Sequence, residues 1–256
     1  MTFRSGDSFE KRHIGPSAAD LREMLSEVGV RSLDSLMTEI VPAGIRNQVS
    51  LPLPVAEFES EYLDRMRGVS ERNVSCRSFI GLGYYGTITP SVILRNVLEN
   101  PGWYTPYTPY QAEVAQGRLE ALLNFQTTVE DLTAMEVANA SLLDEATAAA
   151  EAMVLLHRIR SRQPDAGNVF LVSDCCFPQT VEVLRGRAEP LDLDIKVVPE
   201  ARFAFDDSVF GALLQYPDGN GEIRPLDDVI KAAHEAGVLV GVASDLLALT
   251  LLKPPG

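Results

Sequence analysis

The hydrophobic and polar positions follow two different patterns along the chain. Over the first third, apolar residues recur every three or four positions, which predicts amphipathic helices. After residue 168, short runs of consecutive apolar residues alternate with helical segments. Such runs are typical of strands in a parallel sheet that helices cover on both faces. The pattern therefore predicts an α/β fold with a helical N-terminal arm.

The N-terminal part carries the signals of three short helices. Ser17 can cap the first helix, with Asp20 at the capping-box position and Gly29 as its stop. We expect a second helix over residues 33–40 and a third over residues 58–66. Their apolar stripes are too small to form a core. We therefore predict two units: a helical arm with a linker over residues 1–68, and a larger domain over residues 69–256.

The larger domain is expected to begin with helices and to end with strands. Thr89 and Pro90 read as the N-cap and first residue of a helix that stops at residues 100–102. Ser141 is predicted to cap an alanine-rich helix. Other helices are expected over residues 111–127, 128–134, 179–187 and 226–236. Strands are expected over residues 135–138, 169–172, 195–198, 212–215 and 238–243.

The last predicted strand is followed by only a short segment. A parallel sheet that stops there has an unpaired edge and an uncovered apolar face. We therefore expect the chain to be a fragment or one piece of a larger assembly. A small complete α/β protein is the alternative.

Composition and charge exclude several classes of function. The net charge of −14 repels phosphate backbones, so we expect no nucleic-acid binding. No run of about 18 apolar residues exists, so we expect no membrane partner. The three cysteines, Cys76, Cys175 and Cys176, have no metal-ligand spacing. Reduced thiols suit a cytoplasmic location.

Two segments combine most of the tyrosines with glycine and proline. Residues 79–90 and 103–111 contain five of the seven tyrosines and the only tryptophan. Tyrosine has an apolar body and a polar tip, so a cluster on loops is typical of a ligand or partner surface. The glycines permit close backbone approach. The alternative is an ordinary pair of loops packed on a neighbouring domain.

Other motifs carry weaker signals. A G-x-G-x-x-G pattern at residues 81–86 lacks the preceding strand and following acid of a dinucleotide site, so we reject that reading. Ser141 opens a helix whose first turn holds Asp144 and Glu145, and these acids would repel a phosphate. Asp245 follows the last strand, where it could partner a cofactor ring nitrogen or cap a helix. The histidines His13, His157 and His234 read as structural.

Several long stretches together point to one family: residues 12–15, 78–90, 100–113, 116–126 and 138–153. In these stretches the chain resembles the pyridoxal-phosphate-dependent glycine decarboxylase (P-protein) of the glycine cleavage system. The resemblance implies an aminotransferase-like large domain of the fold type I transferases, here incomplete. It also implies that the chain is the beginning of the N-terminal half, and that the Schiff-base lysine lies in the other half.

The resemblance further implies roles for partners, cofactor and loops. In the family, glycine is decarboxylated with pyridoxal phosphate, and the aminomethyl group passes to the lipoyl arm of H-protein. We expect the cofactor to be bound by the other half and none by this chain alone. The expected partners are the C-terminal half or second subunit and lipoylated H-protein. A non-catalytic interaction subunit and a truncated gene product are the alternatives.

On this reading the tyrosine loops line the substrate channel or the contact between the halves. The residues expected there are Tyr84, Tyr85, Thr87, Tyr104, Thr105, Tyr107, Thr108, Tyr110 and Gln111. Ser141 and Asp245 are expected to be vestigial cofactor-site positions. We predict no catalytic residue and no metal ligand within the chain.

Overall fold

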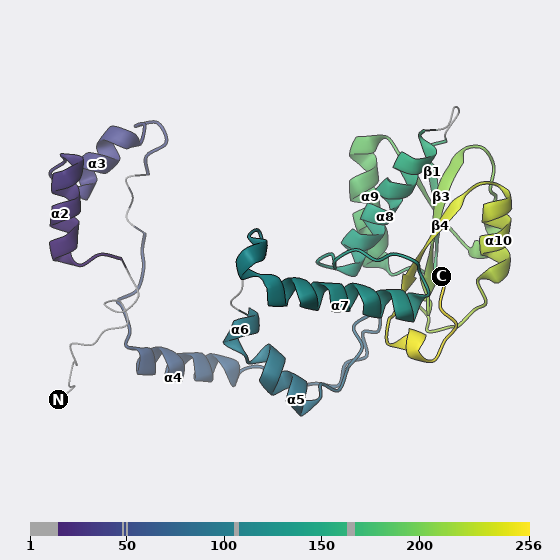
Figure 1. The fold of residues 1–256 in the computed structure, drawn as a ribbon, viewed down its shortest axis with the longest axis horizontal. Coiled ribbons are helices and arrows are strands. Elements are labelled where there is room, and N and C mark those ends of the chain that lie inside the picture. The colour runs from purple at the N-terminus through teal and green to yellow at the C-terminus, as the bar shows by residue number, and fades with distance from the viewer. Residues whose placement is uncertain (1–14, 48, 50, 105–107, 163–166) are drawn as a thin grey trace. The chain divides into compact units, whose positions relative to one another are not determined.

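The computed structural model describes residues 15–47, 49, 51–104, 108–162 and 167–256 (Figure 1). By internal contacts the chain divides into two units, Met1–Arg77 and Ser78–Gly256. The boundary after residue 68 and the separate roles of the two parts stay predictions. The carboxyl-terminal unit holds the sheet and all of the predicted site residues that the structure describes.

The first unit contains the three predicted helices, α2 (Ala18–Val28), α3 (Leu33–Ile40) and α4 (Glu59–Ser70). The Ser17 backbone N–H donates to Asp20 Oδ2 at 2.8 Å, and the Asp20 N–H donates to Ser17 Oγ at 3.3 Å. This reciprocal pair is the predicted capping box. Gly29 ends α2 in the left-handed conformation. None of the three helices contains a fully buried residue, so they form no core among themselves.

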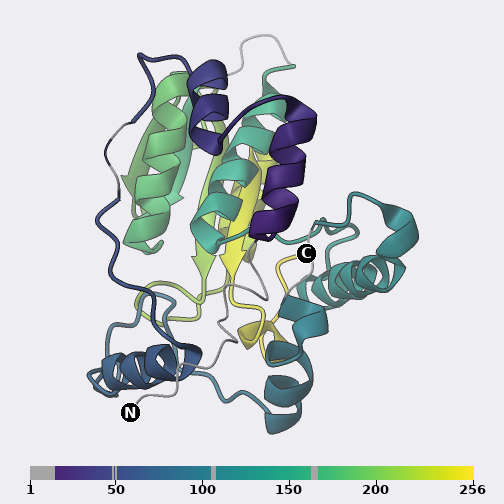
Figure 2. The same cartoon turned by 90° about the vertical axis from the view of Figure 1, so that its left-hand side faces the viewer.

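The second unit is built on a four-stranded parallel sheet with the order β2-β1-β3-β4. Its strands are β1 (Val169–Ser173), β2 (Asp194–Val198), β3 (Val209–Tyr216) and β4 (Leu239–Ser244). Helices α8 (Glu145–Arg160) and α9 (Pro178–Ala188) cover one face, and α10 (Asp227–Glu235) covers the other (Figures 1 and 2). The predicted alternation of strands and helices after residue 168 is confirmed.

The core consists of one apolar cluster on each face of the sheet. Phe170 and Phe210 pack beneath α8 and α9, with their ring centroids 5.2 Å apart. Val169 and Ala212 point to the opposite face, toward α10. Successive residues of a strand point to opposite faces, so continuous apolar strands fill both clusters. Gly211 lies against Phe170, where an added Cβ would be 3.0 Å from the ring.

Short helices and one long helix precede the sheet. They are α5 (Ser91–Ile93), the π-helical η1 (Leu94–Leu98), α6 (Pro101–Tyr104), η2 (Ala112–Val114) and α7 (Gln116–Thr133); shorter turns η3 (Glu189–Leu191), η4 (Glu200–Arg202) and η5 (Ala248–Thr250) follow. The two helices expected over residues 111–134 are one continuous helix from Gln116. A helix also begins at Pro101, where a break was expected, because proline suits the first helical position and Asn100 Oδ1 accepts the Gly102 N–H at 2.9 Å.

Three further local predictions are wrong. Residues 135–138 form no strand, because the Ala138 N–H donates to Glu130 Oε1 and its carbonyl accepts from Gln126 Nε2. Helix α8 is capped by Asp144 instead of Ser141. The Asp144 carboxylate accepts the Thr147 N–H at 2.7 Å and the Thr147 hydroxyl at 2.8 Å. Pro90, not Thr89, occupies the N-cap position of α5.

Candidate functional site

The first tyrosine segment begins with a tight left-handed turn. Gly81, Leu82 and Gly83 have φ values of 65, 54 and 88 degrees. The Tyr84 N–H donates to the Gly81 carbonyl at 2.9 Å and closes the turn. The two glycines adopt this conformation at little cost, whereas Leu82 must be held in it by its surroundings.

Two contacts hold this turn against the start of α9. Gln179 Nε2 donates to the Leu82 carbonyl at 2.8 Å. Gly83 packs on the ring of buried Phe177, where an added Cβ would be 3.0 Å from a ring carbon. Phe177 and Gln179 follow β1 closely in the chain, at the carboxyl end of the parallel strands. Ligands of open α/β sheets bind at this end.

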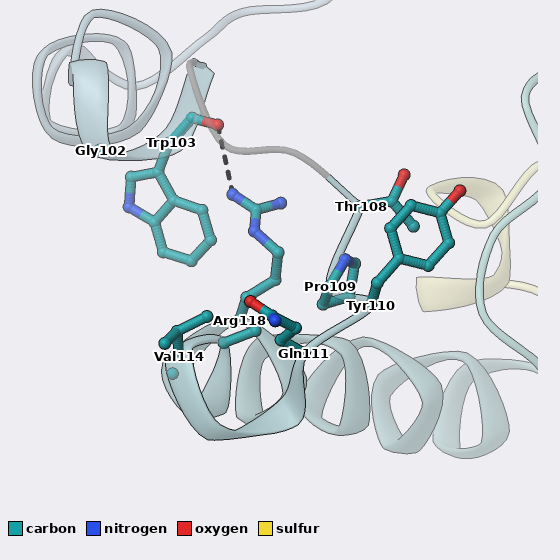
Figure 3. A pocket seen from close by; sticks show the side chains of 10 residues that line it. Gly102, Trp103, Thr108, Pro109, Tyr110, Gln111, Val114 and Arg118 are labelled. Atoms are coloured by element: carbon teal, nitrogen blue, oxygen red, sulfur yellow. Dashed lines mark hydrogen bonds between the residues drawn. The ribbon is translucent and has the colours of Figure 1, made fainter.

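The second tyrosine segment lines a cavity of about 880 Å³ at the N-terminal end of α7 (Figure 3). Its polar and aromatic lining comes from Trp103, Thr108, Tyr110, Gln111 and Arg118. The Arg118 guanidinium donates to the Trp103 carbonyl at 3.3 Å, and its Cζ lies 5.5 Å from the centroid of the indole ring. A cation over an indole face is attracted by the ring quadrupole. Arg118 therefore ties Trp103 to α7.

The structure thus brings part of the predicted site together. Thr108, Tyr110 and Gln111 share the cavity, whereas Tyr84, Tyr85, Thr87 and Tyr104 do not line it. Thr105 and Tyr107 lie outside the described residues. The described tyrosines of both segments are between 53% and 78% exposed, so each is available to a partner or ligand.

Two residues of this surface were missed by sequence reasoning. Arg118 lies in the first turn of α7, where a cation is disfavoured by the helix dipole, and that oddity was a usable signal. Gln179 contacts a residue 97 positions away, and no local pattern marks such a contact.

Acidic groups at the carboxyl edge of the sheet accept hydrogen bonds from nearby backbone and side-chain groups of the chain itself. Asp245 Oδ1 accepts the Leu247 N–H at 2.8 Å and the Ala248 N–H at 3.3 Å, just before the short η5 turn. At the start of α8, hydrogen bonds from the Thr147 backbone and side chain hold the pKa of Asp144 below its usual value. Neighbouring Glu145 accepts from Gln215 Nε2 at 3.4 Å. Ser141 is exposed and makes no cap.

The thiols of Cys175 and Cys176 are not activated, and His157 packs against the core. Burial raises the pKa of the Cys176 thiol to about 12. Burial and the nearby Asp174 carboxylate raise the pKa of Cys175. Both thiols therefore stay protonated at neutral pH, which removes their nucleophilic form. His157 packs edge-on against Phe210 at 5.1 Å, as expected for a structural residue, and His13 lies outside the described residues.

The described residues contain neither a metal-binding cluster nor a membrane-spanning helix. No group of three or more histidine, cysteine, aspartate or glutamate side chains there could hold a metal ion. None of the helices in the same part of the chain combines the length and apolarity needed to cross a membrane.

Comparison with a solved structure defines the class of protein. A crystal structure of glycine decarboxylase (P-protein) of the glycine cleavage system, in inhibitor-bound form, matches 95% of this chain with a TM-score of 0.83 and 31% identity. The match covers 55% of that chain. The fold is therefore part of the large domain of a fold type I, pyridoxal-phosphate-dependent transferase, as the sequence predicted.

The family follows from the sequence comparisons. The family described as "Glycine cleavage system P-protein" matches residues 11–256. The chain therefore belongs to the glycine cleavage system P-protein family. It is 52% identical over 250 residues to a glycine dehydrogenase (decarboxylating) of Nostoc sp. and 56% identical to one of Xylella fastidiosa. It covers about 25% of each relative and corresponds to their N-terminal part.

Proposed function

We propose that the chain is the N-terminal part of a glycine decarboxylase, without the lysine that forms the Schiff base. With the rest of the P-protein it would decarboxylate glycine and transfer the aminomethyl group to the lipoyl arm of H-protein. The observation that carries this proposal is a family match over residues 11–256 in a chain that spans a quarter of its relatives. The three free cysteines suit a cytoplasmic location.

The residues present do not fit a pyridoxal phosphate site in this chain. Each of the three described lysines is paired at the surface: Lys196 with Asp194 at 3.9 Å, Lys231 with Glu235 at 3.9 Å, and Lys253 with Asp227. A Schiff-base lysine needs a desolvated and positioned amine. The carboxylates of Asp144 and Glu145 occupy the start of α8, where a phosphate would otherwise bind. These features support binding of the cofactor by the other half of the enzyme.

The exposed tyrosine segments support a contact with that other half. Tyr84 and Tyr110 are 65% and 78% exposed, and apolar residues beside them are exposed as well, including Ile80, Ile88 and Val114. Exposed apolar residues that lie close together within each segment fit an interaction surface. We propose that these segments form part of the wall of the substrate channel or of the contact between the halves.

The function is tested by measuring carbon dioxide release from glycine, with pyridoxal phosphate and lipoylated H-protein supplied. We expect no release by the chain alone and release once the remainder of the P-protein is added. The chain without the remainder, and the remainder without the chain, are the two controls. Release by the chain alone would refute the proposal.

The role of the tyrosines is tested by replacing Tyr84 with alanine in the assembled enzyme. Loss of the side chain should raise the KM for glycine about ten-fold, or weaken association of the halves by a similar factor. Steady-state kinetics and analytical ultracentrifugation measure the two effects. Tyr62→Ala is the matched control, because Tyr62 packs on Arg65 of its own helix α4. Equal kinetics and association for both variants would exclude Tyr84 from the site.

A non-catalytic interaction subunit is the second candidate, and the same exposed aromatic residues favour it. Such a protein would bind lipoylated H-protein without adding activity to the remainder of the P-protein. The release assay separates the two candidates, because only an enzyme part restores turnover.

A further inference from the structure

We propose that Gln179 is a positioning residue that fixes Tyr84 and Tyr85 at the carboxyl end of the sheet. The inference rests on the proposed function, since it places those tyrosines in the wall of the substrate channel. Gln179 itself lies outside the tyrosine segments and is expected to act only through the Leu82 carbonyl.

The hydrogen bond from Gln179 connects the loop at residues 81–83 to a packed helix. Helix α9 begins with Pro178, and its residues Thr180, Val181 and Leu184 are buried against the sheet. The Gln179 side chain therefore projects from a firmly packed first turn. Its Nε2 reaches the Leu82 carbonyl at 2.8 Å across 97 positions of sequence. Sites held by packed helices keep their geometry better than sites on free loops.

The bond is accepted by Leu82, whose backbone conformation sets the direction of the loop. Leu82 has a φ of 54 degrees, which a leucine seldom adopts without support. Its carbonyl is held by Gln179, and the next residue, Gly83, is seated on the Phe177 ring. These two contacts over-determine the left-handed turn.

Tyr84 and Tyr85 follow the turn directly and are 65% and 53% exposed. Because both side chains are more than half exposed, they take their direction from the turn. Loss of the Gln179 bond would let residues 81–83 leave the left-handed region, and both rings would then sample many positions. Substrate binding should weaken more than turnover, because the tyrosines shape the wall and carry no reacting atom.

The test uses Gln179→Met in the enzyme assembled with the rest of the P-protein. Methionine keeps the length of the side chain and removes the amide donor. We expect amide hydrogen exchange at residues 83–86 to become about ten-fold faster, as for a segment of lower local stability. The KM for glycine should rise about five-fold while kcat changes less than about two-fold. Glu182→Gln is the control on the same helix, because Glu182 pairs with exposed Arg185 at the surface.

A second variant tests the turn independently of Gln179. Gly83→Ala places a Cβ 3.0 Å from the Phe177 ring at a φ of 88 degrees, and it should speed exchange in the same residues. Gly86→Ala is its matched control for exchange, because Gly86 lies outside the left-handed region and an added Cβ would have no atom within 4 Å.

The outcomes separate this inference from the proposed function. Faster exchange with a raised KM supports both. Faster exchange with unchanged kinetics supports the inference that Gln179 holds the turn. It also shows that Tyr84 and Tyr85 do not line the substrate channel. Unchanged exchange in Gln179→Met overturns the inference, whether or not the assembled enzyme releases carbon dioxide.

Discussion

Replacing Phe210 with alanine is expected to lower the free energy of unfolding of the chain by about 3–5 kcal/mol. Phe210 is 1% exposed on the central strand β3. Its ring stacks on Phe170 at 5.2 Å and meets His157 edge-on at 5.1 Å. The cavity left by its removal lies between the sheet and α8, where neither element can move inward without breaking its other contacts. The loss therefore combines a transfer cost with a cavity cost.

Urea denaturation followed by circular dichroism measures this loss. Phe125→Ala is the matched control, because Phe125 lies on α7 and is 39% exposed. We expect the control to cost less than about 1 kcal/mol, since an exposed ring leaves no cavity. Equal losses for the two variants would show that the cluster around Phe210 is not the core of the chain.

Asp218→Ala is expected to cost about 2–3 kcal/mol of unfolding free energy. The carboxylate is 4% exposed at the carboxyl end of β3. Its Oδ1 accepts the Asn220 N–H at 2.8 Å and the Glu222 N–H at 2.9 Å, and its Oδ2 lies 3.3 Å from an Arg224 nitrogen. Alanine would leave both of those N–H groups without this acceptor. The penalty for an unsatisfied donor exceeds the value of an average hydrogen bond.

Asp218→Asn provides the control for this prediction. Asparagine keeps an oxygen at the Oδ1 position and removes the negative charge. We expect it to cost about half as much as alanine, because both N–H groups keep an acceptor. The same urea titration compares the two variants. If asparagine and alanine are equally destabilising, the charge opposite Arg224 matters more than the two backbone hydrogen bonds.

Features that depend on short-range interactions were predictable from the sequence, whereas features that depend on long-range or other side-chain-to-backbone contacts were not. The α2 cap at Ser17 and Asp20 was predictable because both partners lie within one turn. The strands after residue 168 were predictable because short apolar runs between helical segments are typical of buried parallel strands. The wrong strand at residues 135–138 and the wrong cap at Ser141 share one cause. In each case a side chain, Glu130 or Asp144, bound the backbone in a way that no apolar pattern records.

The same distinction between short-range and long-range contacts applies to the candidate site. The unusual content of tyrosine, glycine and proline in residues 79–111 identified this surface from the sequence alone. The contact of Gln179 with Leu82 and the cation–π contact of Arg118 with Trp103 required the fold. They join residues that are 97 and 15 positions apart, and neither pair has a local signature.

By itself the sequence determined the family, the parallel α/β class and the segments that carry the tyrosines, because these depend on residue type and short-range order. Only the tertiary structure decided which residues of those segments share a cavity, and which helix supports the left-handed turn before Tyr84 and Tyr85. The physical reason is that a hydrogen bond or a ring contact depends on distance in space. The distance between two remote residues is set by packing of the whole sheet and its helices.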